Sequence, residues 1–202
     1  MSGSPVVIAS QASPDRLRAL MRPGHKGALA LAFVLALALP GVSGCGYSPS
    51  NEGDEGEPIQ LGELEINVQL TRFLNPADHE DKNYLVGQTI PPPAGKVYLG
   101  VFLTMTNHGD SETRIPSDAQ MTVVDTTGAG YQAVPSDTPF AAPLGTELAG
   151  HSTIPVPDSP AQSGPTDGSI VLFLVDEGVS ENRPLKLEIE HEGETGDITL
   201  DI

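Results

Sequence analysis

The alternation of apolar and polar residues in the second half of the chain most constrains its fold. Between Lys96 and Asn107, alternate residues are apolar and share one face of an extended chain: Val97, Leu99, Val101, Leu103 and Met105. Successive side chains of a β-strand point to opposite faces, so this pattern predicts a strand with one buried face. No segment after residue 45 has the i, i+3, i+4 apolar spacing of an amphipathic helix. The sequence therefore predicts an all-β domain.

Other short apolar segments are separated by Gly, Pro, Asn and Asp and are also predicted to be strands: 64–71, 119–126, 131–134, 147–155, 170–175, 185–190 and 198–202. Residues 170–175 are apolar on both faces, as a central strand would be. Turns recur roughly every 8–12 residues, which favours an antiparallel, immunoglobulin-like β-sandwich of about seven to nine strands. Residues 75–95 are expected to form a long surface loop. The strand order in the Pro-rich segment 135–168 stays open.

A charge-free apolar run, from Gly27 to Pro40, precedes this region. Basic residues come before the run, and small residues follow it up to the only cysteine of the chain: Val42, Ser43, Gly44 and then Cys45. A basic start, a short apolar stretch and small residues are typical of an export signal. A membrane-spanning helix needs about 20 apolar residues, so the run is too short to be one.

Because Cys45 directly follows the small residues, this segment resembles the signal of a bacterial lipoprotein, with Val42 to Cys45 as its lipobox. The resemblance implies that residues 1–44 are removed and that the Cys45 sulfur carries a diacylglyceryl group, with fatty acyl chains such as palmitate. Two acyl chains anchor a protein stably, whereas one binds a membrane only marginally. The expected location is the extracytoplasmic face of the cell membrane. Whether translation starts at Met1 or Met21 stays open.

Composition limits the partners of the processed chain. Only Asp15 of the 27 acidic residues lies before Cys45, whereas four of the 10 basic residues do, so processing leaves a formal net charge of −20. This charge repels phosphates, which argues against nucleic-acid binding, and it favours cations and basic partners. Residues 46–58 are acidic and rich in Gly, Pro and Ser, so we expect a disordered linker there. The sandwich is expected to span residues 59–202.

Two motifs then suggest a family. The strand from Lys96 ends in Asn107-His-Gly109, and a second strand leads into a turn with Asp125, Gly128 and Tyr131. This pair, in a match over roughly residues 96–190, resembles the DUF4352 type of extracellular lipoprotein domain. The resemblance implies an immunoglobulin-like sandwich on a bacterial surface lipoprotein and implies no settled activity. Turn geometry is the expected role of these motif residues, and packing is the expected role of the Tyr131 ring.

No catalytic motif is evident. The sequence lacks Gly-x-Ser-x-Gly, His-Glu-x-x-His and a Gly-rich phosphate loop, and no free cysteine remains after lipidation. We therefore expect no enzyme activity and no cofactor.

Metal binding is an alternative with weak candidates. Calcium takes oxygen ligands, and two acidic pairs flank turns: Asp110 with Glu112, and Asp176 with Glu177. Copper would take Met105, His108 and Met121, but the two methionines fall in phase with apolar strand faces, which favours core packing.

The sequence thus predicts a lipid-anchored module that binds another protein or an envelope component without catalysis. Its partner is not identified by any residue pattern. The alternative is a binder of a small cationic ligand or a metal ion, with calcium favoured over copper.

Overall fold

The computed structural model describes residues 50–202, so the predicted signal, the lipobox and Cys45 lie outside the described residues. In the described part, the strands are β1 (Glu52–Asp54), β2 (Ile59–Leu61), β3 (Leu64–Leu74), β4 (Lys96–Asn107), β5 (Thr113–Arg114), β6 (Met121–Val124), β7 (Gly130–Val134), β8 (Glu147–Leu148), β9 (Thr153–Ile154), β10 (Ser169–Asp176), β11 (Leu185–His191) and β12 (Glu194–Leu200). The helices are α1 (Asp81–Tyr84) and α2 (Pro160–Ser163), with 3-10 turns η1 (Asp118–Gln120) and η2 (Glu177–Asn182). None of these helices is long and apolar enough to cross a membrane.

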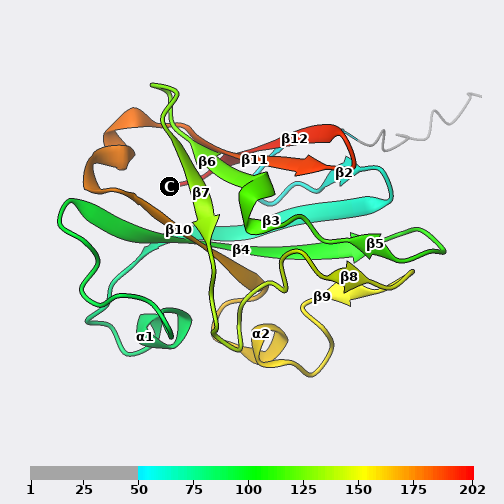
Figure 1. The fold of residues 1–202 in the computed structure, drawn as a ribbon, viewed down its shortest axis with the longest axis horizontal. Helices are drawn as coiled ribbons and strands as arrows, with labels where there is room; N and C mark the ends of the chain where they lie inside the picture. Colours follow the sequence, from blue (N-terminus) through cyan, green and yellow to red (C-terminus); the bar gives the residue numbers. More distant parts are fainter. Residues whose placement is uncertain (1–49) are drawn as a thin grey trace, which may run out of the picture. The chain divides into compact units, whose positions relative to one another are not determined.

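Nine strands follow one hydrogen-bonded order, β1-β12-β11-β6-β7-β10-β4-β3-β2, and a tenth, β9, pairs with β4 off this path. The order folds into two facing layers, because β7 pairs with β6 in the first layer and with β10 in the second (Figure 1). Strands β5 and β8 form a separate two-stranded ladder. The prediction of an all-β sandwich is confirmed.

Apolar side chains from both layers meet in one core. Strands β3, β4 and β10 contribute from one layer, and β6, β11 and β12 from the other. The alternation predicted for β4 is confirmed, since Leu99, Val101 and Leu103 are buried in this core while Phe102 points to the opposite face. The chain has no tryptophan, so aliphatic side chains supply most of the packing.

A second, smaller core covers the outer face of the β4–β10 layer. Tyr84 of α1 packs edge-on against Phe102 and Phe140, with 5.1 Å between ring centroids in both pairs. Arg72 holds α1 in place, since its guanidinium lies 2.7 Å from the Asp81 carboxylate and within 6 Å of the Tyr84 ring. Strand β10 is therefore buried on both faces, as its sequence predicts. Residues 75–95, predicted as a surface loop, instead include this buried helical turn.

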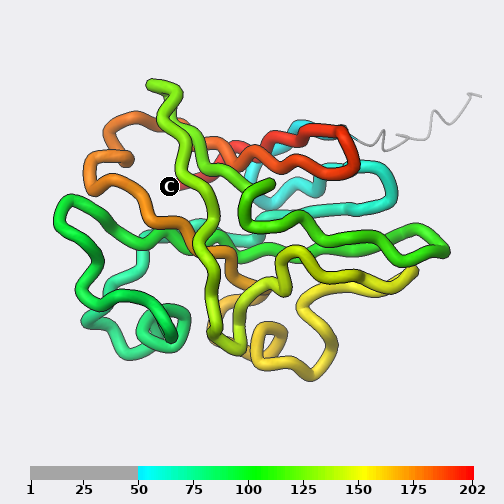
Figure 2. Tube along the Cα trace, viewed as in Figure 1, coloured from blue at the N-terminus to red at the C-terminus, as the bar shows by residue number. Residues whose placement is uncertain are grey.

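The edge of the sandwich opposite β7 is closed by the first described residues (Figure 2). Strand β1 pairs with β12 and β2 pairs with β3, so residues 50–61 join the two layers. The prediction of a disordered linker through Pro58 is wrong for β1, which pairs through main-chain hydrogen bonds that need no apolar side chains. The β1–β12 pair is also parallel, whereas the other paired strands are antiparallel, and an isolated bridge between Ala141 and Ile170 is parallel as well.

Several strands are shorter than the sequence pattern suggests. Residues 50–202 contain twelve strands against the predicted seven to nine, and five of them are only two or three residues long. The single strand expected near 147–155 is two strands, β8 and β9, that pair with different partners. These short strands account for the difference: β1 and β2 end the main order, β9 pairs with β4, and β5 and β8 form their own ladder.

A β-bulge changes which residues of β3 are buried. The register with β4 shifts between Val68 and Leu70. Ile66 before the bulge is fully buried, whereas Leu70 is 37% exposed and Thr71 takes the inward position. The sequence alternates apolar and polar residues through Leu70, but buried and exposed residues do not alternate in this way along β3.

Because of this bulge, we expect two similar substitutions in β3 to lower the free energy of unfolding by different amounts. Ile66→Ala should lower the free energy of unfolding by about 2–5 kcal/mol, because it leaves a cavity in the core. Leu70→Ala removes a side chain of the same carbon count and should cost less than about 1 kcal/mol, because that residue is partly exposed. Urea unfolding of both variants gives the two values. Equal losses would place Leu70 in the core and contradict the bulge.

Candidate functional site

Asn107, one of the predicted motif residues, is fully buried, and its side chain makes four hydrogen bonds. Its side-chain amide donates to the carbonyls of Ser111, Leu148 and Ala149 at 2.8, 3.0 and 3.2 Å, and its Oδ1 accepts from the Gly109 N–H at 2.9 Å. These bonds tie the end of β4 to the chain around β5 and β8. The Asn107 side chain thus bonds to the Gly109 N–H within the turn that follows β4.

Asp125 organises the β6–β7 turn in the same way. One carboxylate oxygen accepts from the Thr127 hydroxyl at 2.6 Å and from the main-chain N–H groups of Thr127 and Ala129. Gly128 in this turn has φ +86°, a conformation that glycine adopts without strain. These hydrogen bonds, above all that from the Thr127 hydroxyl, lower the pKa of Asp125 below its ordinary value of 3.8.

Tyr131 and Asp176 pair at the same end of the sandwich. The Tyr131 hydroxyl donates to the Asp176 carboxylate at 3.1 Å, and the Lys96 ammonium lies 2.6 Å from that carboxylate. The Lys96 hydrogen bond is the main reason that the pKa of Asp176 is lowered. Burial, followed by the bond to Asp176, raises the pKa of Tyr131. Each polar group here has a partner, so the cluster stabilises the turn.

The two predicted acidic pairs lie at opposite ends of the sandwich. Asp110 accepts from the His151 ring at 3.0 Å beyond the end of β4, whereas Asp176 is bound by Lys96 at the start of that strand. Among residues 50–202, no three His, Cys, Asp or Glu side chains converge as ligands of one metal ion would. The structure therefore does not bring the four acids together.

The three residues considered as copper ligands differ in burial: two lie in the core and one is half exposed. Met105 and Met121 are fully buried in the core, as the sequence analysis favoured. His108 is half exposed beyond the end of β4, where its ring lies 3.3 Å from Glu65.

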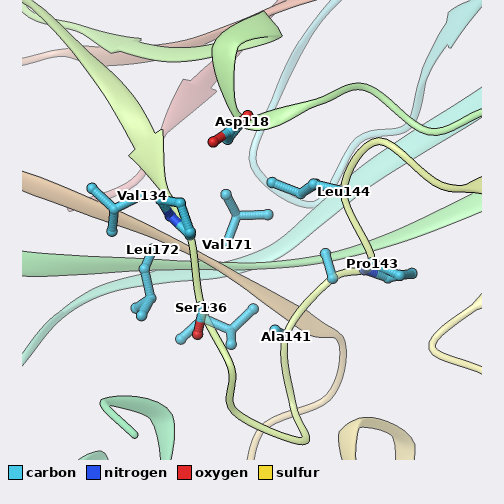
Figure 3. Close-up of a pocket in the computed structure, with 11 residues that line it drawn as sticks. Asp118, Val134, Ser136, Ala141, Pro143, Leu144, Val171 and Leu172 are labelled. Atoms are coloured by element: carbon cyan, nitrogen blue, oxygen red, sulfur yellow. The ribbon is translucent and has the colours of Figure 1, made fainter. Parts of the chain in front are cut away.

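A pocket that the sequence analysis missed opens where β7 leaves the edge of β10 (Figure 3). Its volume is about 290 Å³, and polar and apolar atoms share its exposed surface about equally. Nine of the eleven lining residues have apolar side chains, and one carries a carboxylate: Asp118, Val134, Pro135, Ser136, Ala141, Ala142, Pro143, Leu144, Ile170, Val171 and Leu172. Figure 3 shows Asp118 on one side of the pocket and Ser136 on the other, with Val134 and Leu144 on the flanks. The lining comes from four separate chain segments, which no local sequence pattern reveals.

A larger depression of about 630 Å³ lies between the β1 turn and the last described residues. Two of its charged side chains, Glu55 and Arg183, already have partners within the sandwich. The Glu55 carboxylate accepts from the main-chain N–H groups of Thr71 and Asp201, and the Arg183 guanidinium donates to the carbonyl of Ile202. We therefore regard the pocket beside β7 as the candidate binding site.

No protein-family model matches the chain, and no curated protein matches it significantly. Solved structures share its β-sandwich fold at low identity. One is an uncharacterised β-sandwich protein of Clostridium difficile, with 14% identity and a TM-score of 0.44, covering 76% of this chain and 95% of that chain. Another is the secreted protein MPT63 of Mycobacterium tuberculosis, with 13% identity and a TM-score of 0.47, covering 77% and 99%.

A third similar structure is the candidate lipoprotein YcdA of Bacillus subtilis, with 10% identity and a TM-score of 0.46, covering 73% of this chain and 39% of that one. Likeness at this level concerns the architecture and carries no argument about function.

The lowered pKa of Asp125 predicts an acid-dependent loss of stability. A carboxylate whose pKa is lower in the folded state stabilises the fold above its unfolded pKa, and this contribution is lost as the pH falls through the folded pKa. The free energy of unfolding should therefore fall as the pH drops below about 4. In Asp125→Asn that fall should be shallower.

Urea unfolding at a series of pH values between about 5 and 2 measures this dependence. Asp158→Asn makes the same chemical change at an exposed residue and should leave the pH dependence as in the parent. A parent-like slope in Asp125→Asn would contradict the assigned hydrogen bonds.

Proposed function

We propose that this chain is an exported, lipid-anchored interaction module that binds a basic segment of another envelope protein and has no catalytic activity. The anchor is the acylated Cys45, and the DUF4352-like motifs agree with a module of this kind. The observation that carries the binding role is the pocket beside β7, because it combines apolar walls with one carboxylate at its side.

The size and charge of the pocket indicate what it would bind. Small-molecule pockets usually begin at about 300 Å³, so this one accommodates a single large side chain or a small molecule. Val134, Leu144 and Val171 offer apolar contact to an aliphatic stem, while Asp118 attracts a positive head. A lysine or arginine side chain has both parts. The strong negative charge of the processed chain would speed the approach of such a partner.

A small cationic molecule with an apolar body is the second candidate, because the same pocket chemistry suits it. A ligand that binds only the folded protein raises the melting temperature, whereas a macromolecular partner absent from the assay does not. Thermal melts with aliphatic amines, calcium and a chelator therefore separate the two candidates.

The anchor predicts a change of location. Cys45→Ala removes the acylated sulfur, so the protein should lose incorporated palmitate and appear in the medium or a soluble fraction of expressing bacteria. Metabolic labelling with a palmitate analogue, followed by fractionation, measures both. Ser43→Ala keeps a small residue in the lipobox and should remain labelled and membrane-bound. Persistent labelling of Cys45→Ala would refute the anchor.

If the pocket binds the partner, residue 144 in its lining should contact that partner directly. A photo-cross-linking amino acid at residue 144, on intact cells, should capture one dominant protein. The same group at Val156, which is 60% exposed, should not capture it. Asp118→Lys should reduce capture about tenfold by reversing the charge at the pocket, whereas Asp158→Lys should not.

Thermal melting would verify that both variants are folded. An identical set of adducts at residues 144 and 156 would argue against the pocket as the contact site.

A further inference from the structure

The described chain begins at one end of the sandwich and is held there by hydrogen bonds. Ser50 accepts from the Gln60 N–H at 2.8 Å, and Asn51 accepts from the Asp197 N–H at 2.9 Å. The Asn51 amide also donates to the carbonyl of Thr195, close to the turn between β11 and β12. Strand β1 then runs parallel to β12, away from that turn. The chain therefore enters the sandwich at the end that carries the β11–β12 turn.

The same end carries two other turns. Leu64 of β3 pairs with Asn107 of β4, so the β2–β3 turn at Gly62 lies beside the chain that leaves β4. The Gly62 N–H donates to the Glu194 carboxylate at 2.9 Å, which joins this turn to the start of β12. We call this end, formed by residues 62–63, 108–112 and 192–194, the entry end. The opposite end holds the β6–β7 turn and η2.

The distance between Cys45 and the entry end is short. Five residues lead from Cys45 to Ser50, and a fully extended chain spans at most about 3.6 Å per residue, so the span is at most about 18 Å. Strand β4 has 12 residues and runs from the opposite end to the entry end, a length of about 40 Å at 3.3 Å per residue. An anchor at Cys45 thus keeps the entry end near the membrane, and the opposite end reaches it only if the sandwich lies on its side.

The entry end is strongly acidic. Its turns contribute five carboxylates: Glu63, Asp110, Glu112, Glu192 and Glu194. The nearby Arg114 lies 3.7 Å from Glu147 and is therefore already paired. Anionic lipid head groups carry the same sign of charge, and their repulsion acts over a Debye length of about 10 Å at 0.1 M salt. Since the processed chain is acidic as a whole, tilting the sandwich onto its side would bring further negative charge to the membrane.

We infer that the short link to Cys45 makes the entry end face the bilayer, and that repulsion between the acidic sandwich and anionic lipid disfavours its lying on its side, so that the β6–β7 turn and η2 point outward. The entry end thus faces an anionic lipid surface and does not bind it. The inference rests on the proposed anchor at Cys45. It adds an orientation that the proposed partner binding does not require.

Energy transfer to an acceptor lipid tests the orientation. The lipid-anchored protein is recovered from membranes and reconstituted in phosphatidylcholine vesicles, with one fluorescent amino acid in place of an exposed glutamate. Glu112 marks the entry end, and Glu181 of η2 marks the opposite end. Transfer should be clearly greater from residue 112 than from residue 181. Equal transfer, or greater transfer from residue 181, would overturn the orientation.

Lipid charge and salt test the repulsion. Adding phosphatidylglycerol should lower the transfer from residue 112, and raising the salt concentration should restore it, because salt screens exposed charges. Transfer that is unchanged by phosphatidylglycerol would overturn the electrostatic part of the inference. Protein that is not recovered with membranes would instead refute the anchor itself, so the two failures are distinguishable.

Discussion

The change of layer by β7 is the constraint on which the sandwich and its pocket both depend. Gly130, Tyr131 and Gln132 pair with β6, whereas Ala133 and Val134 pair with β10. One strand thus completes an edge of each layer, which leaves fewer unpaired main-chain groups for unwanted association. Beyond Val134, residues 140–142 take over as neighbours of β10, through the bonds of Ile170 with Phe140 and Ala142. The pocket is the space between the departing β7 and this replacement segment, so it follows from the topology.

The opposite edge is closed by contacts of a different kind. Gly196 of β12 lies so close to β2 that a Cβ atom there would come within 2.7 Å of the Ile59 side chain. The Glu55 carboxylate accepts one main-chain N–H from Thr71 in β3 and another from Asp201 after β12. One acid therefore links the two layers where no ladder does. Because the chain has a single cysteine, it cannot form a disulfide within itself, so closure at both edges must come from such non-covalent contacts.

The sequence predicted those parts of the fold in which side-chain pattern and burial coincide. The bounds of β4 and the double burial of β10 follow from apolar periodicity alone. Leu70 was misjudged because a bulge changes the face without changing the pattern, and β1 was missed because main-chain bonds form it. The candidate pocket was missed for a third reason. Its lining combines Asp118, Val134 and Leu144 from segments that only the tertiary fold brings together.

In the proposed function, the negative charge of the whole chain and the carboxylate beside the pocket both favour positively charged ligands, but with different selectivity. An excess of carboxylates around a sandwich disfavours contact with anionic lipid and with other copies of itself. The same excess concentrates cations near the surface, but exposed carboxylates hold them weakly because water competes for the charge. A carboxylate beside an apolar pocket, such as Asp118, selects differently, because a ligand there must bring apolar surface as well as positive charge. In the proposed function, the general charge attracts many cations, and the pocket distinguishes those with an apolar stem.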